Sequence, residues 1–141
     1  MCLLGSTNTQ AQQSTIITPI EAVMRAAEAA TTKERFVRGV FEMVVRGSGR
    51  QDSMAYLNSE VDYRDQRALT LAILPRAQAA LQQLYGTDVV NALKGKRLRV
   101  TGSAQRATIW FYSNGQRTEK YYFQTHVMIF RADQITVIGD G

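Results

Sequence analysis

The stretch that decides the fold is residues 107–123, which read ATIWFYSNGQRTEKYYF. Two runs rich in aromatic and β-branched residues flank Asn114-Gly115, and this dipeptide between such runs is the strongest short-range signal for a β-hairpin. Alternation along each strand divides the rings between the two faces of the hairpin, with one set expected in the core and the other exposed. It separates Trp110 and Tyr112 from Phe111, and Tyr121 and Phe123 from Tyr122.

Strand patterns also occur on both sides of this hairpin. Gly39 lies in the middle of the first strand, where a bulge or a sharp bend is expected. The segment 47–53, GSGRQDS, has the composition of a flexible turn. The predicted strands outside the hairpin are residues 35–46, 54–59 and 68–74, a fourth that begins at Arg97, and a closing strand at 135–138.

One predicted helix precedes the strands and a second interrupts them. The first begins at Thr18-Pro19, where threonine caps, proline suits the first helical position and Glu21 completes a capping box. The second occupies residues 76–85 and ends at Gly86, and one more helical turn follows at 87–93.

The element order is therefore strand, strand, strand, helix, strand, strand. A helix between the third and fourth strands of a five-stranded barrel is the arrangement of the OB-fold. We predict a mainly β chain: a single five-stranded OB-fold-like barrel with a helix between strands 3 and 4, an N-terminal helix, and a long hairpin between strands 4 and 5. This domain is expected over residues 17–141, after a disordered tail or signal remnant at residues 1–16.

Three further segments carry a family resemblance. They read MAYLNSEVDYRD leading into ALTLAIL (54–65 and 68–74), LKGKRLRVTG (93–102) and ADQITVI (132–138). Together they resemble the bacterial OB-fold nucleic-acid-binding-like domains of secreted nucleases and small lipoproteins, over roughly Lys33 to Ile138. The resemblance implies the barrel and a binding function. The chain departs from the family at residues 106–124. Members of the family usually have a short turn between the fourth and fifth strands, whereas this chain has a long aromatic hairpin.

Composition favours an anionic partner. The chain carries 17 basic and 12 acidic residues, for a net charge of +5, and its pI is about 9.7. A single cysteine excludes an internal disulfide and a Cys-x-x-Cys site. No apolar run reaches the length of a membrane-spanning helix.

Single-strand binders combine cations for phosphates with flat rings for bases, and an OB barrel binds on its second and third strands between two clamping loops. On this basis we predict a nucleic-acid-binding surface. Each part of this surface has a competing interpretation. The hairpin rings could serve only to stabilise the hairpin through cross-strand pairs, Arg38 and Arg50 could be solvated surface residues, and Tyr56 could belong to the core. The predicted residues are Arg38, Arg50, Tyr56, Arg97, Arg99, Arg106, Trp110, Tyr112, Arg117, Lys120 and Tyr122.

Catalysis, cofactors and metals are not expected. His126 has no cysteine or acidic partner nearby in the sequence, which favours a packed or surface histidine. The oxygen-bearing residues Asp62 and Asp65 match no calcium-loop spacing and are better explained as turn formers. The sequence therefore predicts a binding module and not an enzyme, with single-stranded nucleic acid as its partner.

The beginning of the chain leaves a second interpretation open. Thr9-Gln10-Ala11 resembles a weak export cleavage site, and Cys2 is placed where a lipid-bearing cysteine would lie. The alternative is thus an exported or lipid-anchored OB domain that binds a protein or glycan through its hairpin. Periplasmic or exported and cytoplasmic locations remain equally open, as does the oligomeric state.

Overall fold

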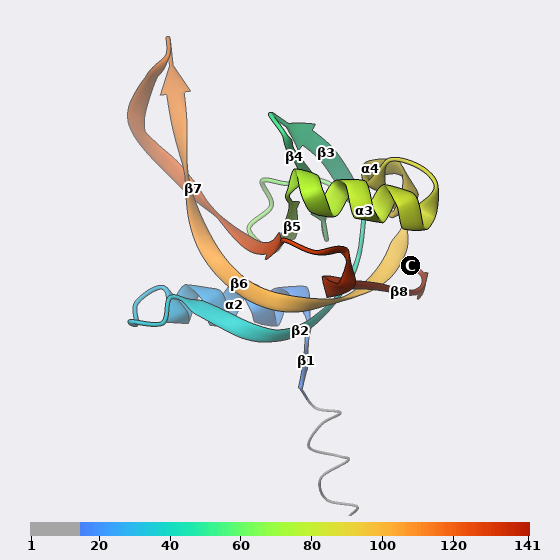
Figure 1. The fold of residues 1–141 in the computed structure, drawn as a ribbon. Helices are drawn as coiled ribbons and strands as arrows, with labels where there is room; N and C mark the ends of the chain where they lie inside the picture. The colour runs from blue at the N-terminus through green and yellow to red at the C-terminus, as the bar shows by residue number, and fades with distance from the viewer. Residues whose placement is uncertain (1–14) are drawn as a thin grey trace, which may run out of the picture.

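The computed structural model describes residues 15–141, so Cys2 and the predicted cleavage site lie outside the described part. Eight strands form one mixed sheet, and the helices pack around it (Figure 1). The strands are β1 (Ile16–Ile17), β2 (Phe36–Val44), β3 (Gly47–Gln51), β4 (Met54–Asn58), β5 (Leu69–Ile73), β6 (Lys96–Ser113), β7 (Gln116–Ile129) and β8 (Ile135–Asp140). The helices are α2 (Pro19–Ala29), α3 (Pro75–Tyr85), α4 (Val89–Ala92) and the 3₁₀ turn η1 (Ala132–Gln134).

The predicted closed five-stranded barrel is wrong. The strand order is β1-β2-β6-β7-β5-β4-β3, an open path on which β8 adds a further pairing to β6. One cause lies at residues 47–53, because the segment predicted as a turn contains β3, whose backbone pairs with β4 despite its glycines. The chain changes partner between Val45, whose N–H donates to Lys96, and Arg46, whose N–H donates to Asn58. Periodicity shows that a segment is extended, but it does not show which neighbour it pairs with.

The helices are found where the sequence predicts them. The Thr18 hydroxyl accepts the Glu21 N–H at 3.3 Å, so the predicted cap at the start of α2 is present. Gly86 ends α3 with a φ of 78°, in the left-handed region that favours glycine. The short helical turn expected at 87–93 is α4, and Asp88 caps it by accepting the Val90 N–H.

The bulge predicted as one possibility at Gly39 is absent. The β2–β6 register passes through Gly39 without a shift, so the strand has no bulge there. A Cβ at this position would lie 2.9 Å from Cδ1 of Ile17. Glycine therefore makes room for the side chain of β1, which pairs with β2 in parallel.

The core lies between the sheet and the helices. Its largest fully buried side chains include Phe41, Leu57, Leu71, Leu81 and Leu98, which come from four strands and α3. Burial of this much apolar surface is the main source of folding stability. The alternate residues of β4, β5 and β7 point away from this core and form an outer face of the sheet.

Candidate functional site

The β6–β7 hairpin extends beyond the rest of the molecule as an arm, defined here as residues 106–124 (Figure 1). Its turn is the predicted Asn114-Gly115, with φ of 51° and 77°, so the hairpin prediction is confirmed. Trp110 pairs with Tyr121, and the register then shifts before Tyr112 pairs with Arg117. The arm therefore has two faces, both of which carry aromatic rings.

One face of the arm, here called the ladder face, stacks cations and rings on one another. The Arg106 guanidinium lies 3.9 Å from the Phe123 ring centre, and that of Arg117 lies 4.3 Å from the Trp110 ring. Tyr121 lies between them, with ring centres 5.4 Å from Phe123 and 5.0 Å from Trp110. These cation–ring and ring–ring contacts stabilise the arm.

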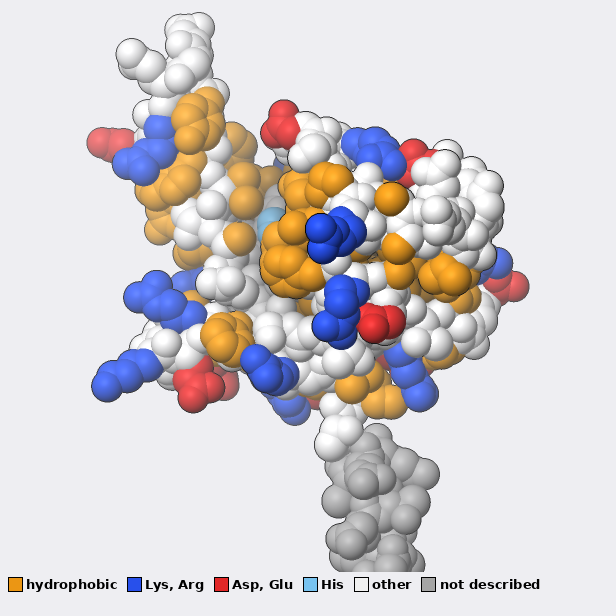
Figure 2. All heavy atoms as spheres, viewed as in Figure 1, with side chains coloured by type: hydrophobic (Ala, Val, Ile, Leu, Met, Phe, Trp, Pro, Cys, Tyr) orange, Lys and Arg blue, Asp and Glu red, His pale blue; other side chains and the backbone are white. Residues whose placement is uncertain are grey.

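The opposite face of the arm, together with Trp110 of the ladder face, borders a cleft of about 600 Å³. Figure 2 shows it as a hollow between the arm and the body, in which the pale-blue histidine is visible. Among the described residues, those that line the cleft include no Asp or Glu. The lining residues come from β3, β4, the β4–β5 loop, β5, the arm and the adjoining part of β7: Ser48, Gly49, Arg50, Gln51, Tyr56, Asn58, Tyr63, Arg64, Thr70, Ile109, Trp110, Phe111, Tyr112, Tyr122, Gln124 and His126.

Two arginines at the cleft are held in place by carboxylates outside it. Arg50 donates to Gln78 Oε1 at 2.6 Å and to the carboxylate of Asp88. Arg64 pairs with Asp62 and lies 5.7 Å from the Tyr63 ring. The pairing fixes the guanidinium groups at the rim, while each keeps N–H groups for a ligand.

A chain of hydrogen bonds crosses the wall of the cleft. Gln124 Nε2 donates to the Tyr122 hydroxyl oxygen at 2.8 Å, and Gln124 Oε1 lies 2.7 Å from His126 Nε2. Because an amide oxygen only accepts, His126 carries its proton on Nε2. The Tyr122 hydroxyl oxygen accepts the hydrogen bond from Gln124, so its own proton remains for a hydrogen bond to solvent or to a ligand. Burial raises the pKa of this phenol, which keeps it protonated.

A buried hydrogen bond joins two strands at the floor of the cleft. Thr70 Oγ1 donates to Asn58 Oδ1 at 2.7 Å, and both residues are buried. Tyr56 stands beside them on β4, with its ring centre 6.3 Å from that of His126. Side chains presented from paired strands are held more precisely than side chains on a free loop.

Acidic pH is expected to destabilise the fold through His126. Burial lowers the pKa of this imidazole below its ordinary 6.5, so the unfolded chain binds a proton more readily as the pH falls through that value. The free energy of unfolding should be constant above about pH 6.5 and should decline below it. Urea denaturation at about pH 7.5 and about pH 5 measures this. The variant His126→Gln should lose less stability than the unmodified chain when the pH is lowered between these two values. An equal loss in both proteins would assign the effect to other groups.

The structure brings together five of the predicted site residues at the cleft: Arg50, Tyr56, Trp110, Tyr112 and Tyr122. The others lie elsewhere. Arg106 and Arg117 are on the ladder face, Lys120 lies at the register shift of the arm, and Arg38 borders a second hollow. Arg97 and Arg99 are exposed on β6, where Arg99 lies 4.0 Å from Glu42.

Sequence reasoning missed Tyr63, Arg64, Phe111, Gln124 and His126 as cleft residues. One signal was present, because residues 122, 124 and 126 alternate along one strand and must share a face. The expectation that one ring set is buried was wrong, since Phe111 is 47% exposed and Tyr121, on the opposite face, 51%. The turn interpretation of Asp62 and Asp65 is confirmed, because each carboxylate accepts the N–H two residues further on.

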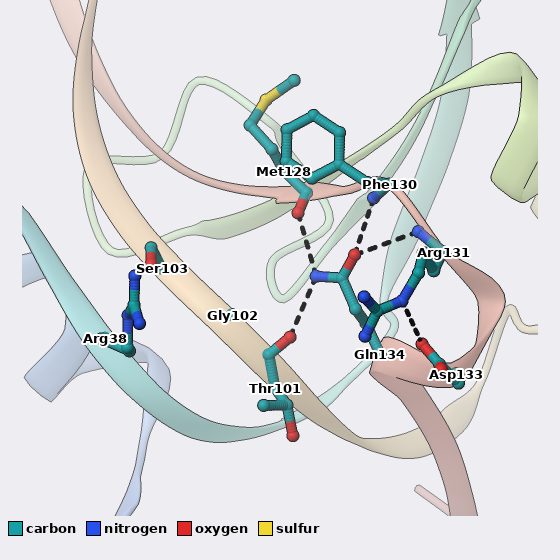
Figure 3. Close-up of a pocket in the computed structure, with 9 residues that line it drawn as sticks. All are labelled: Arg38, Thr101, Gly102, Ser103, Met128, Phe130, Arg131, Asp133 and Gln134. Atoms are coloured by element: carbon teal, nitrogen blue, oxygen red, sulfur yellow. Dashed lines mark hydrogen bonds and ion pairs between the residues drawn. The ribbon is translucent and has the colours of Figure 1, made fainter.

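A second hollow, of about 510 Å³, opens at the end of β7 (Figure 3). Gln134 closes one side, donating to the carbonyls of Thr101 and Met128 and accepting the N–H groups of Phe130 and Arg131. This amide has all its hydrogen bonds within the protein, so it shapes the hollow without reaching into it.

Within residues 15–141, no group of three or more His, Cys, Asp or Glu side chains is placed to hold a metal ion. In the same part of the chain, no helix combines the length and the apolar character needed to cross a bilayer.

Comparisons with known proteins give little guidance. No protein-family model matches the chain, and no curated protein matches it. A solved structure assigned as an aspartyl-tRNA synthetase from Leishmania major Friedlin is similar at a TM-score of 0.45 and 9% identity. The similarity covers 90% of this chain and 21% of the synthetase chain. At these values it supports neither a fold assignment nor a function.

Proposed function

We propose that this chain is a binding module for single-stranded nucleic acid and that the ligand lies in the cleft between the arm and β3–β4. The observation that carries the proposal is the make-up of the cleft wall. Among the described residues, six tyrosine, phenylalanine and tryptophan residues and two arginines line the cleft, and no carboxylate does. Rings for stacking beside cations for phosphates are the combination that single strands require.

The charge of the arm supports the same ligand. Among the described residues, Arg106, Arg117 and Lys120 have no carboxylate partner, and the only acid on the arm is Glu119. Figure 2 shows a basic group beside apolar side chains on the arm, with an acidic group next to it. A cationic surface beside an acid-free cleft attracts a polyanion and accelerates its association.

A titration of a labelled single-stranded oligonucleotide at low and at high salt tests the proposal. We expect binding at low salt and an affinity that falls as salt rises, with a logarithmic slope of about 0.7 for each phosphate neutralised. Trp110 is the only tryptophan of the chain and lines the cleft, so its emission provides a label-free signal. Absence of binding at low salt would end the proposal.

A protein partner is the second candidate. Within residues 15–141, β6 beyond Gln105 pairs only with β7, so this part of the chain leaves the backbone of an edge strand open for a further strand. Such a partner would be held by main-chain hydrogen bonds and would bind with a weak dependence on salt, which separates it from the first candidate.

A further inference from the structure

The second hollow lies on the same face of the sheet as the cleft. The register joins Asn58, Thr70, His126, Gln105 and Phe36 into one row that crosses β4, β5, β7, β6 and β2. Partners in such a row point to the same side of a sheet. The row begins in the cleft and ends on β2, about 19 Å away at the usual strand spacing.

The neighbouring row leads into the hollow itself. Tyr56 of the cleft pairs with Ala72, which pairs with Met128. Met128 lines the hollow, and Arg38, two residues from Phe36 along β2, lines its opposite side. The outer face of β7 thus passes from Gln124 and His126 in the cleft to Met128 in the hollow without a break.

The hollow has side chains suited to the same ligand. Figure 3 shows Arg38 on one side and Met128 and Phe130 on the other, with Gly102 between them. Within the described chain Arg38 has no ion-pair partner, and Phe130 is 57% exposed. The single carboxylate of the hollow, Asp133, is already paired with Arg131.

We propose that a strand bound in the cleft continues across β7 into this hollow, where Arg38 contacts a phosphate and Phe130 stacks on a base. This inference rests on the proposed function and extends it, because it assigns a second subsite and makes affinity depend on ligand length. A short oligonucleotide occupies the cleft alone, whereas a longer one reaches both subsites.

Two oligonucleotides, of about 4 and about 16 nucleotides, test this, since single-strand sites span lengths in that range. Phe130→Ala should weaken binding of the longer one about tenfold and leave the shorter unchanged. Arg38→Gln should reduce the salt slope for the longer one by about 0.7, as expected for one lost phosphate contact. Arg97→Gln is the control for Arg38→Gln, and Ile138→Ala is the control for Phe130→Ala, because these residues are exposed and line neither subsite. Both control variants should leave the affinity for the longer oligonucleotide and its salt slope unchanged.

The outcomes separate the two proposals. If Phe130→Ala and Arg38→Gln both bind the longer oligonucleotide as the unmodified chain does, while a cleft variant loses affinity, the second subsite is refuted and the function stands. If the unmodified chain binds neither oligonucleotide at low salt, the proposed function fails and the subsite fails with it. Circular dichroism of each variant verifies the fold, and the arginine variant tests the subsite even if Phe130→Ala were unstable.

Discussion

Replacing Tyr122 by alanine is expected to lower the affinity for a single-stranded oligonucleotide by about 1–3 kcal/mol, which is roughly five- to 150-fold. Tyr122 lines the cleft, its ring centre lies 5.5 Å from that of Phe111, and its hydroxyl oxygen accepts a hydrogen bond from Gln124. Its removal takes away a stacking surface and a hydroxyl group at the cleft. Trp110 fluorescence or the anisotropy of a labelled oligonucleotide measures the change.

The chain supplies its own control for this variant. Tyr121 is the adjacent residue, is also a tyrosine and is exposed, but it lies on the ladder face. Tyr121→Ala should therefore leave affinity within about twofold, because the Tyr121 side chain is exposed and does not itself line the cleft. If Tyr121→Ala weakened binding and Tyr122→Ala did not, the ligand would lie on the ladder face and the cleft assignment would be wrong.

Tyr122→Phe separates the ring from the hydroxyl. The ring and its contact with Phe111 remain, but Gln124 Nε2 loses its acceptor and the cleft loses a donor. A loss as large as that of alanine would assign the energy to hydrogen bonding, and a small loss would assign it to stacking.

The local structure of this chain could be predicted from sequence where short-range chemistry decides it. Asn114-Gly115 specifies the tip of the arm through positive φ, and Thr18 specifies the start of α2 through its hydroxyl. Gly86 ends α3 for the same conformational reason. Each of these signals acts within a few residues, so no knowledge of the rest of the fold is needed.

Long-range pairing could not be predicted in this way. Residues 47–51 have a turn composition, yet they form β3 because each of them pairs with a residue of β4. The same limit applies to the site, since Arg50 is held by Asp88, which lies 38 residues further along the chain. Sequence reasoning selected five of the cleft residues by residue type, but it grouped them with Arg97 and Arg99, whose position depends on the register of β6.

Gly47 connects this strand pairing to the cleft. It is buried, and a Cβ on it would lie 2.9 Å from the carbonyl oxygens of both Glu60 and Val61. These are backbone atoms that cannot rotate away, so an added methyl group must displace the β4–β5 loop. That loop carries Tyr63 and Arg64, which line the cleft.

Gly47→Ala is therefore expected to lower the free energy of unfolding by about 1–3 kcal/mol, the usual cost of overpacking. It should also weaken oligonucleotide binding by up to about tenfold, because Tyr63 is moved from its stacking position. Urea denaturation and limited trypsin digestion at the exposed Arg64 and Arg67 measure the two effects on the fold. Gly49→Ala is the matched control for stability, since a Cβ at that position meets nothing within 4 Å. If Gly47→Ala were as stable as Gly49→Ala and its loop no more readily cut, the contact between β3 and the loop would not hold the wall of the cleft in place.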